Sequence, residues 1–111
     1  MKYLCLAYGD EKDWKKLTRE QQEEYLAQDE VLLQRGDFVA AVQPSATMVR
    51  AWDGTPSTVR GTFAASELPL AGFSIIEAAD LEEVVRLVAG TPCARARGVI
   101  EIRPLLEPTP S

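Results

Sequence analysis

The chain has no histidine and only two cysteines among its 111 residues. Without histidine there is no Ser-His-Asp triad, no histidine-ligated metal and no imidazole to act as an acid or base near neutral pH. Two cysteines are too few for a disulfide scaffold or a cysteine-rich zinc site. Cys5 lies in an apolar segment and Cys93 in a Thr-Pro-Cys turn. We interpret both as reduced thiols of a cytoplasmic protein.

Long hydrophobic runs and an excess of basic charge are also missing. The apolar stretch at residues 1–8 is far shorter than the roughly 18 apolar residues of a membrane span, so neither a membrane segment nor an export signal is expected. Twelve Lys and Arg against seventeen Asp and Glu give a net charge of −5. That sign opposes phosphate binding, so nucleic acid is not an expected partner. No phosphate-binding glycine loop or metal-ligand set is recognisable, and we expect no cofactor and no metal.

What the chain does contain is the composition of one soluble domain. Hydrophobic residues make up 46% and charged residues 26% of it, close to the averages for globular proteins. Thr18 and Gln21 have capping-box spacing and predict the start of a long helix, which ends at Gly36. Asp80 caps a second helix. Its apolar stripe at i, i+3, i+4 and i+7 consists of Leu81, Val84, Val85 and Val88.

The remaining regular segments are predicted strands, because they are rich in β-forming residues and end in turn residues. They comprise residues 3–8, 38–42, 47–52, 72–78 and 99–103. The Asp53-Gly54 turn folds the third strand back onto an arm at residues 57–60, which gives a hairpin. The polar segment around Trp14 and the segment 61–69 are expected to be loops. Residues 107–111 are expected to form a frayed tail.

This order predicts an α+β domain with a ferredoxin-like βαββαβ fold and an inserted hairpin, spanning residues 1–106. Right-handed crossovers place both helices on one face of a four-stranded sheet. The other face is also expected to be apolar, because both sides of these strands are apolar: Leu4 and Leu6 alternate with Tyr3, Cys5 and Ala7, and Phe73 and Ile75 alternate with Ile76 and Ala78. A second copy is the simplest cover for such a face. We therefore predict a homodimer, a dimeric α/β barrel; the alternative is a monomer whose second face is more polar.

Several segments resemble the YCII-related proteins, and within them the subgroup named after an Asp-Gly-Pro-Phe (DGPF) signature. The likeness is carried by residues 1–4, Tyr8-Gly9-Asp10, residues 43–50, Asp53-Gly54, residues 72–77, residues 80–83, Pro92 and residues 98–104. It covers about residues 1–106 and implies the ferredoxin-like fold and the dimeric α/β barrel, in a family whose activity is mostly unassigned.

Two departures from that family bear on function. Arg60-Gly61-Thr62-Phe63 stands where the signature is expected, so a base replaces the acid and threonine replaces the proline. Related proteins carry a histidine on the first helix as part of a proposed dyad. A loose alignment places Tyr25 near that position, and we do not transfer the role to it.

Two residues of the first helix are candidates for catalysis. Tyr25 and Asp29 lie four residues apart on one helix face, where a phenol and a carboxylate could share a proton in one cavity. The alternative is a partly buried tyrosine beside a solvated aspartate.

Ligand-binding candidates lie on the hairpin and the loop after it. Arg50 and Trp52 alternate on one strand face, where the arginine could hold a ligand carboxylate or stack on a ring; the alternative is an arginine on an exposed edge. Arg60 and Phe63 flank Gly61, and a cationic group beside an aromatic ring could close over an anionic or aromatic molecule.

These residues support three hypotheses. The first is a homodimer that binds a small anionic or aromatic molecule in a pocket framed by the first helix, the hairpin strand and the Arg60–Phe63 loop. The second is a cofactor-independent isomerase, lyase or cyclase, in which Tyr25 with Asp29 or Glu77 transfers a proton and Arg50 stabilises an enolate. The third is an accessory or regulatory dimer that works through its surface.

Overall fold

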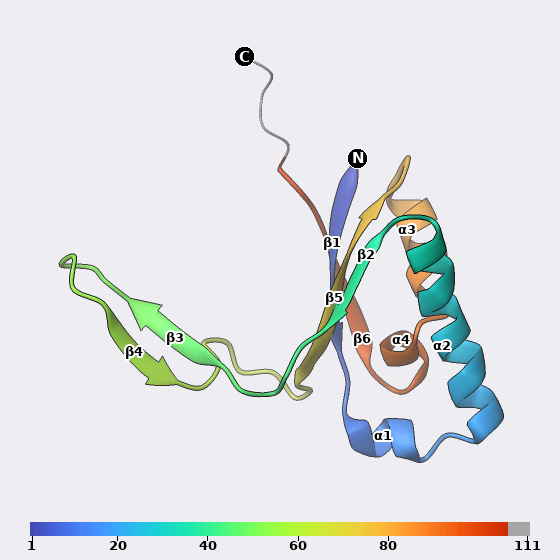
Figure 1. Ribbon diagram of the computed structural model, residues 1–111, viewed down its shortest axis with the longest axis horizontal. Helices are drawn as coiled ribbons and strands as arrows, with labels where there is room; N and C mark the ends of the chain where they lie inside the picture. The colour runs from blue at the N-terminus through green and yellow to red at the C-terminus, as the bar shows by residue number, and fades with distance from the viewer. Residues whose placement is uncertain (107–111) are drawn as a thin grey trace.

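An antiparallel sheet of four strands forms the centre of the computed structural model, which describes residues 1–106 (Figure 1). Its strands are β1 (Lys2–Tyr8), β2 (Phe38–Ala41), β5 (Leu70–Glu77) and β6 (Val99–Pro104). Their order across the sheet is β2-β5-β1-β6. This order confirms the predicted ferredoxin-like arrangement, in which the first and third strands of the repeat lie in the middle. The tail expected at residues 107–111 lies outside the described residues.

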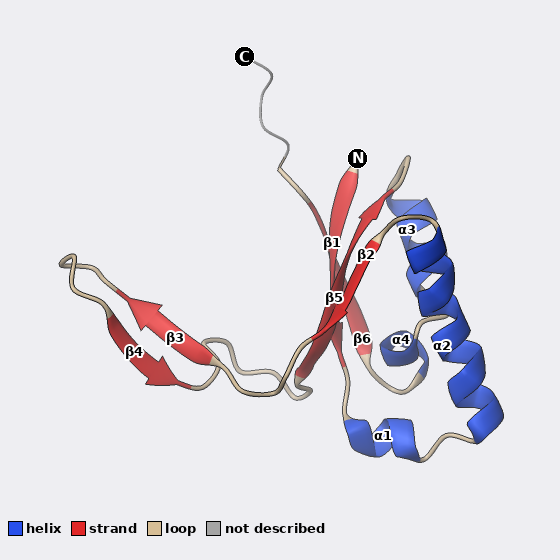
Figure 2. Ribbon diagram, in the orientation of Figure 1, coloured by secondary structure: helices blue, strands red, loops and turns tan. Residues whose placement is uncertain are grey.

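The main helices lie together on one face of this sheet (Figure 2). They are α2 (Arg19–Gln34) and α3 (Leu81–Val88). The predicted capping box of α2 is formed: the Gln21 amide nitrogen donates to Thr18 Oγ1 at 3.1 Å, and the Thr18 amide nitrogen donates to Gln21 Oε1 at 2.9 Å. Asp80 caps α3 by accepting from the Glu83 amide nitrogen at 2.9 Å. Local capping chemistry therefore fixes where both helices begin.

Two short helices correct the sequence interpretation. The segment around Trp14, expected to be a loop, contains α1 (Glu11–Lys15), which is capped by Asp10. After α3, Thr91-Pro92 does not simply stop the chain; Pro92 opens α4 (Pro92–Arg95), because proline is well suited to the first turn of a helix. Helices of one turn are too short to show an apolar period, which is why the sequence pattern did not reveal them.

The hairpin forms a separate two-stranded sheet of β3 (Thr47–Arg50) and β4 (Ser57–Arg60). It extends away from the central sheet on the side opposite the helices (Figure 1). The third strand, expected at residues 47–52, ends at Arg50, so Trp52 lies in the turn. An isolated two-stranded hairpin is marginally stable in water, so this arm is a candidate for contact with a second copy.

The sheet has one covered face and one open face. On the covered face, a core of Tyr3, Cys5, Ile76 and Val84 is buried under the helices with Leu32. On the open face, the predicted apolar row is present. Cross-strand pairing aligns Phe38 with Ile75 and Ile75 with Leu4, while Phe73 pairs with Leu6. The Phe38 and Phe73 rings lie 5.6 Å apart, and Phe38 is 55% exposed.

Candidate functional site

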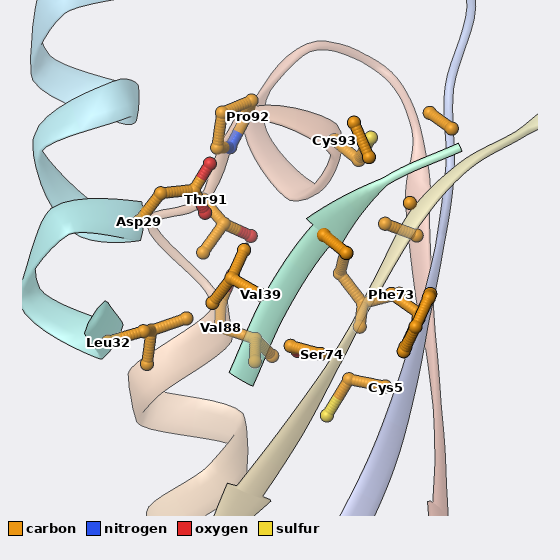
Figure 3. Close-up of a pocket in the computed structure, with 16 residues that line it drawn as sticks. Cys5, Asp29, Leu32, Val39, Phe73, Ser74, Val88, Thr91, Pro92 and Cys93 are labelled. Atoms are coloured by element: carbon orange, nitrogen blue, oxygen red, sulfur yellow. The ribbon is translucent and has the colours of Figure 1, made fainter. Parts of the chain in front are cut away.

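A cavity of about 230 Å³ lies between the helices and the sheet (Figure 3). Its floor is formed by strand residues such as Cys5, Val39 and Ser74, and its roof by Asp29 and Leu32 of α2 and by the residues that link α3 to α4. The lining is mostly apolar. Its polar side chains are those of Asp29, Ser74, Thr91 and the two cysteines, Cys5 and Cys93.

Asp29 is the ionisable carboxylate that lines this cavity. Figure 3 shows its side chain reaching from α2 toward Thr91 and Pro92. Burial raises the pKa of Asp29 above its ordinary value, and no charge or hydrogen bond from the described residues counteracts that shift. An ionised carboxylate facing an apolar hollow without a partner costs free energy. Groups held in this way are candidates for binding or proton transfer.

Cys93 lies on the same wall as Asp29. Burial raises the pKa of its thiol, and the negative charge of Asp29 raises it further. The thiol is therefore held neutral, which agrees with its interpretation as a reduced and unreactive group. Gly9 makes room for it, since a Cβ at that position would lie 3.0 Å from Cys93 Sγ.

Tyr25, the predicted partner of Asp29, does not line this cavity. Its side chain is only 4% exposed, and the Arg95 guanidinium carbon lies 4.6 Å from its ring centroid. The structure thus pairs Tyr25 with the cation of α4 and leaves Asp29 alone at the cavity. Glu77, the other predicted proton acceptor, is exposed near the end of β5 and is also absent from the cavity wall.

Three of the four predicted ligand-binding residues meet on the hairpin. The Arg50 guanidinium carbon lies 5.9 Å from the ring centroids of both Trp52 and Phe63. Trp52 is 91% and Phe63 83% exposed. Arg60 lies on β4, paired across the hairpin with Thr47. Because the arm extends from the other side of the sheet, the expected pocket that joins the first helix to the hairpin is not formed within one copy of residues 1–106 (Figure 1).

A scan against protein families matches residues 1–109 to the YCII-related domain. The chain belongs to the YCII-related family. A search of curated proteins finds no match. Among solved structures, this YCII-related chain is similar to a 5-chloro-2-hydroxyhydroquinone dehydrochlorinase from Burkholderia phenoliruptrix AC1100 in complex with 2,5-dihydroxybenzoquinone. The two share 17% sequence identity with a TM-score of 0.50, over 97% of this chain and 96% of that chain. At this identity the likeness shows the fold.

The sequence of this YCII-related protein did not predict that Thr91, Pro92 and Cys93, at the start of α4, line the cavity. Thr91 donates its hydroxyl hydrogen to the Val88 carbonyl at 2.6 Å, and Pro92 and Cys93 follow it along the wall. The Thr-Pro-Cys turn is visible in the sequence, but nothing in it predicts that these residues lie near Asp29. Within residues 1–106, no cluster of three acidic, cysteine or histidine side chains could hold a metal ion. No helix there has the length and apolarity needed to cross a bilayer.

Proposed function

We propose that this YCII-related protein binds a small hydroxylated aromatic molecule beside Asp29. The observation that carries the proposal is an unpaired, partly buried carboxylate on the wall of an otherwise apolar cavity. An apolar cavity of about 150 Å³ is large enough for benzene, so a volume of about 230 Å³ suits one substituted ring. The apolar wall would contact the ring, and Asp29 would accept a hydrogen bond from a ring hydroxyl.

The charge of Asp29 narrows the ligand class predicted from the sequence. A carboxylate on the ligand would face the Asp29 carboxylate, and like charges in a partly desolvated site repel. A phenolic hydroxyl instead supplies the donor that Asp29 lacks. The sequence predicted an anionic or an aromatic ligand, and of these two the cavity favours the aromatic one. Anionic groups would suit the arginines of the hairpin better.

Thermal unfolding with a small panel of rings tests this proposal. Phenol, hydroquinone and catechol are compared with benzoate. A ligand present at 100 times its dissociation constant should stabilise the fold by about 2.7 kcal/mol. Asp29→Asn should weaken binding of the hydroxylated rings, whereas Glu30→Gln, which removes one exposed charge from the same helix, should not. Equal stabilisation of the two variants, or none of the wild type, would contradict the proposal.

A second candidate function is proton-transfer catalysis on such a ring. It is favoured by the raised pKa of Asp29, because burial makes this carboxylate a stronger proton acceptor than an exposed aspartate. The structurally similar protein named above is a dehydrochlorinase. In the corresponding reaction of a chlorinated hydroxyhydroquinone, one hydroxyl proton moves to the chlorine-bearing carbon. A second hydroxyl proton is then lost as the C–Cl electron pair leaves with chloride. The net change is loss of HCl and formation of a hydroxyquinone.

Chloride release from 5-chloro-2-hydroxyhydroquinone measures this activity directly. We expect Asp29→Asn to slow the reaction by about 100-fold or more, the usual contribution of a general acid or base, and Glu30→Gln to leave it unchanged. Release no faster than in buffer would leave ligand binding as the function. If neither reaction nor binding is found, the accessory or regulatory dimer becomes the better hypothesis.

We further propose that two copies pack through their open sheet faces. The apolar row of Phe38, Phe73, Ile75, Leu4 and Leu6 supports this arrangement, since an apolar patch of this kind usually marks an interface. The hairpin extends on the same side of the sheet (Figure 1). A second copy on the open face would lie beside the hairpin. There it could contact the cluster formed by Arg50, Trp52 and Phe63.

A further inference from the structure

A second and larger cavity adjoins the Asp29 cavity. Its volume is about 620 Å³, more than twice that of the first. The two cavities share four lining residues, Ala41, Ala71, Pro92 and Cys93. The two cavities therefore adjoin along these four residues. A substituent on a ring held beside Asp29 that extends past Pro92 and Cys93 would enter this second space.

The outer wall of the second cavity is built largely by α1 and α2, through Trp14 and Leu26. The backbone at Trp14 is held against α2, because Gln22 Nε2 donates to the Trp14 backbone carbonyl oxygen at 2.9 Å. On the opposite side, the Gly9 amide donates to the Pro69 carbonyl at 3.0 Å and holds the loop before β5 against the end of β1. The wall is thus a defined apolar surface with an indole ring in it.

The rim of the same cavity carries negative charge. Asp10 and Glu11 both line it. The Asp10 carboxylate accepts from the Lys12 amide nitrogen at 2.9 Å, and Glu11 pairs with Lys15 at 3.5 Å where both side chains are exposed. The Asp10 carboxylate therefore leaves negative charge at this rim, which disfavours an anionic group entering here.

We propose that the second cavity receives an uncharged apolar substituent of the ligand, so that the ligand class is a phenol bearing an alkyl or aryl group rather than a bare ring. The proposal rests on the proposed function, because it takes the phenolic end to be held by Asp29. Trp14 and Leu26 contact the substituent. The acidic rim disfavours substituents that end in a carboxylate.

Calorimetric titration with 4-alkylphenols, from 4-methylphenol to 4-hexylphenol, tests the proposal. Each methylene group buried in the second cavity should lower the dissociation constant about fourfold. A 4-hydroxyphenylalkanoic acid of matching length should bind more weakly than the hydrocarbon. In Trp14→Ala the dependence on chain length should flatten, while the affinity for 4-methylphenol stays within about twofold. Leu33→Ala, which removes an exposed apolar side chain of α2 that lines neither cavity, serves as the matched control and should keep the full dependence.

Leu26→Ala gives an independent version of the test should Trp14→Ala fail to fold, because Leu26 is an exposed helix residue on the same wall. In a Trp52→Phe background Trp14 is the sole tryptophan, and its fluorescence should respond to 4-hexylphenol more than to 4-methylphenol. Affinities that do not change with chain length, while Asp29→Asn still weakens 4-methylphenol, would overturn this proposal and leave the proposed function intact. Absence of binding by any alkylphenol would overturn both.

Discussion

Ile75 and Ile76 are neighbours on β5, yet they lie on opposite faces of the sheet and in different surroundings. Ile76 is 0% exposed beneath the helices, whereas Ile75 pairs with Phe38 and Leu4 on the face without helices. Both faces are apolar, so the hydrophobic pattern alone does not distinguish them. What differs is the cover: within residues 1–106, helices cover one face and no layer covers the other. The comparison teaches that helical cover, and not the hydrophobic pattern, distinguishes the two faces, and it supports the proposal that a second copy packs on the open face.

The largest effect is expected from a charge placed on the open face. Ile75→Asp should abolish the proposed homodimer, because an unpaired charge buried in an interface costs about 3–5 kcal/mol, more than 100-fold in Kd. Sedimentation velocity at micromolar concentration measures the change. Leu81→Asp adds the same charge on the exposed side of α3 and should leave the dimer intact. A wild-type particle of 12.2 kDa would show that the open face needs no cover.

Replacing each isoleucine by alanine sharpens the comparison within one strand. Ile76→Ala should lower the free energy of unfolding by about 2–5 kcal/mol at any protein concentration, because it opens a cavity in the core. Ile75→Ala should cost less than half as much in dilute solution, where the open face is solvated. At high concentration its cost should rise as the dimer forms. Urea denaturation at two protein concentrations separates these cases, and equal losses that do not vary with concentration would argue against a covered open face.

The fold was predictable because its signals are local and agree with one another. The capping box at Thr18, the apolar stripe of α3 and the alternation in β1 and β5 each determine one element, and their order leaves one common topology. Both apolar faces were also predictable from alternation. The one-turn helices α1 and α4 were not, because a single turn has no period to detect.

The site was less predictable because it depends on contacts between distant segments. Helical spacing correctly placed Tyr25 and Asp29 on neighbouring turns. Arg95, however, lies 70 positions after Tyr25, and its packing over the Tyr25 ring has no sequence signature. Likewise, nothing in the Thr-Pro-Cys turn shows that Cys93 faces Asp29. The hairpin cluster was anticipated in its members Arg50, Trp52 and Phe63. Its distance from α2 was not predictable, because the sequence does not show that the hairpin extends from the side of the sheet opposite the helices (Figure 1).

The smallest effect is expected on the covered side of the sheet, where the contribution of Asp29 to stability should depend on pH. Burial raises the pKa of Asp29 in the folded state, so the folded protein binds the proton more tightly than the unfolded chain does. The stability that comes with the proton is fully present below the ordinary pKa of 3.8. It is lost as the pH rises through the folded-state pKa.

Asp29→Asn removes this titration, so the variant should melt at a higher temperature than wild type at pH 7. The two melting temperatures should converge as the pH falls toward 3.8. Glu30→Gln should show no such convergence. A wild type more stable than Asp29→Asn at pH 7 would mean that the carboxylate has a stabilising partner, and Asp29 would then be a structural residue rather than a binding one.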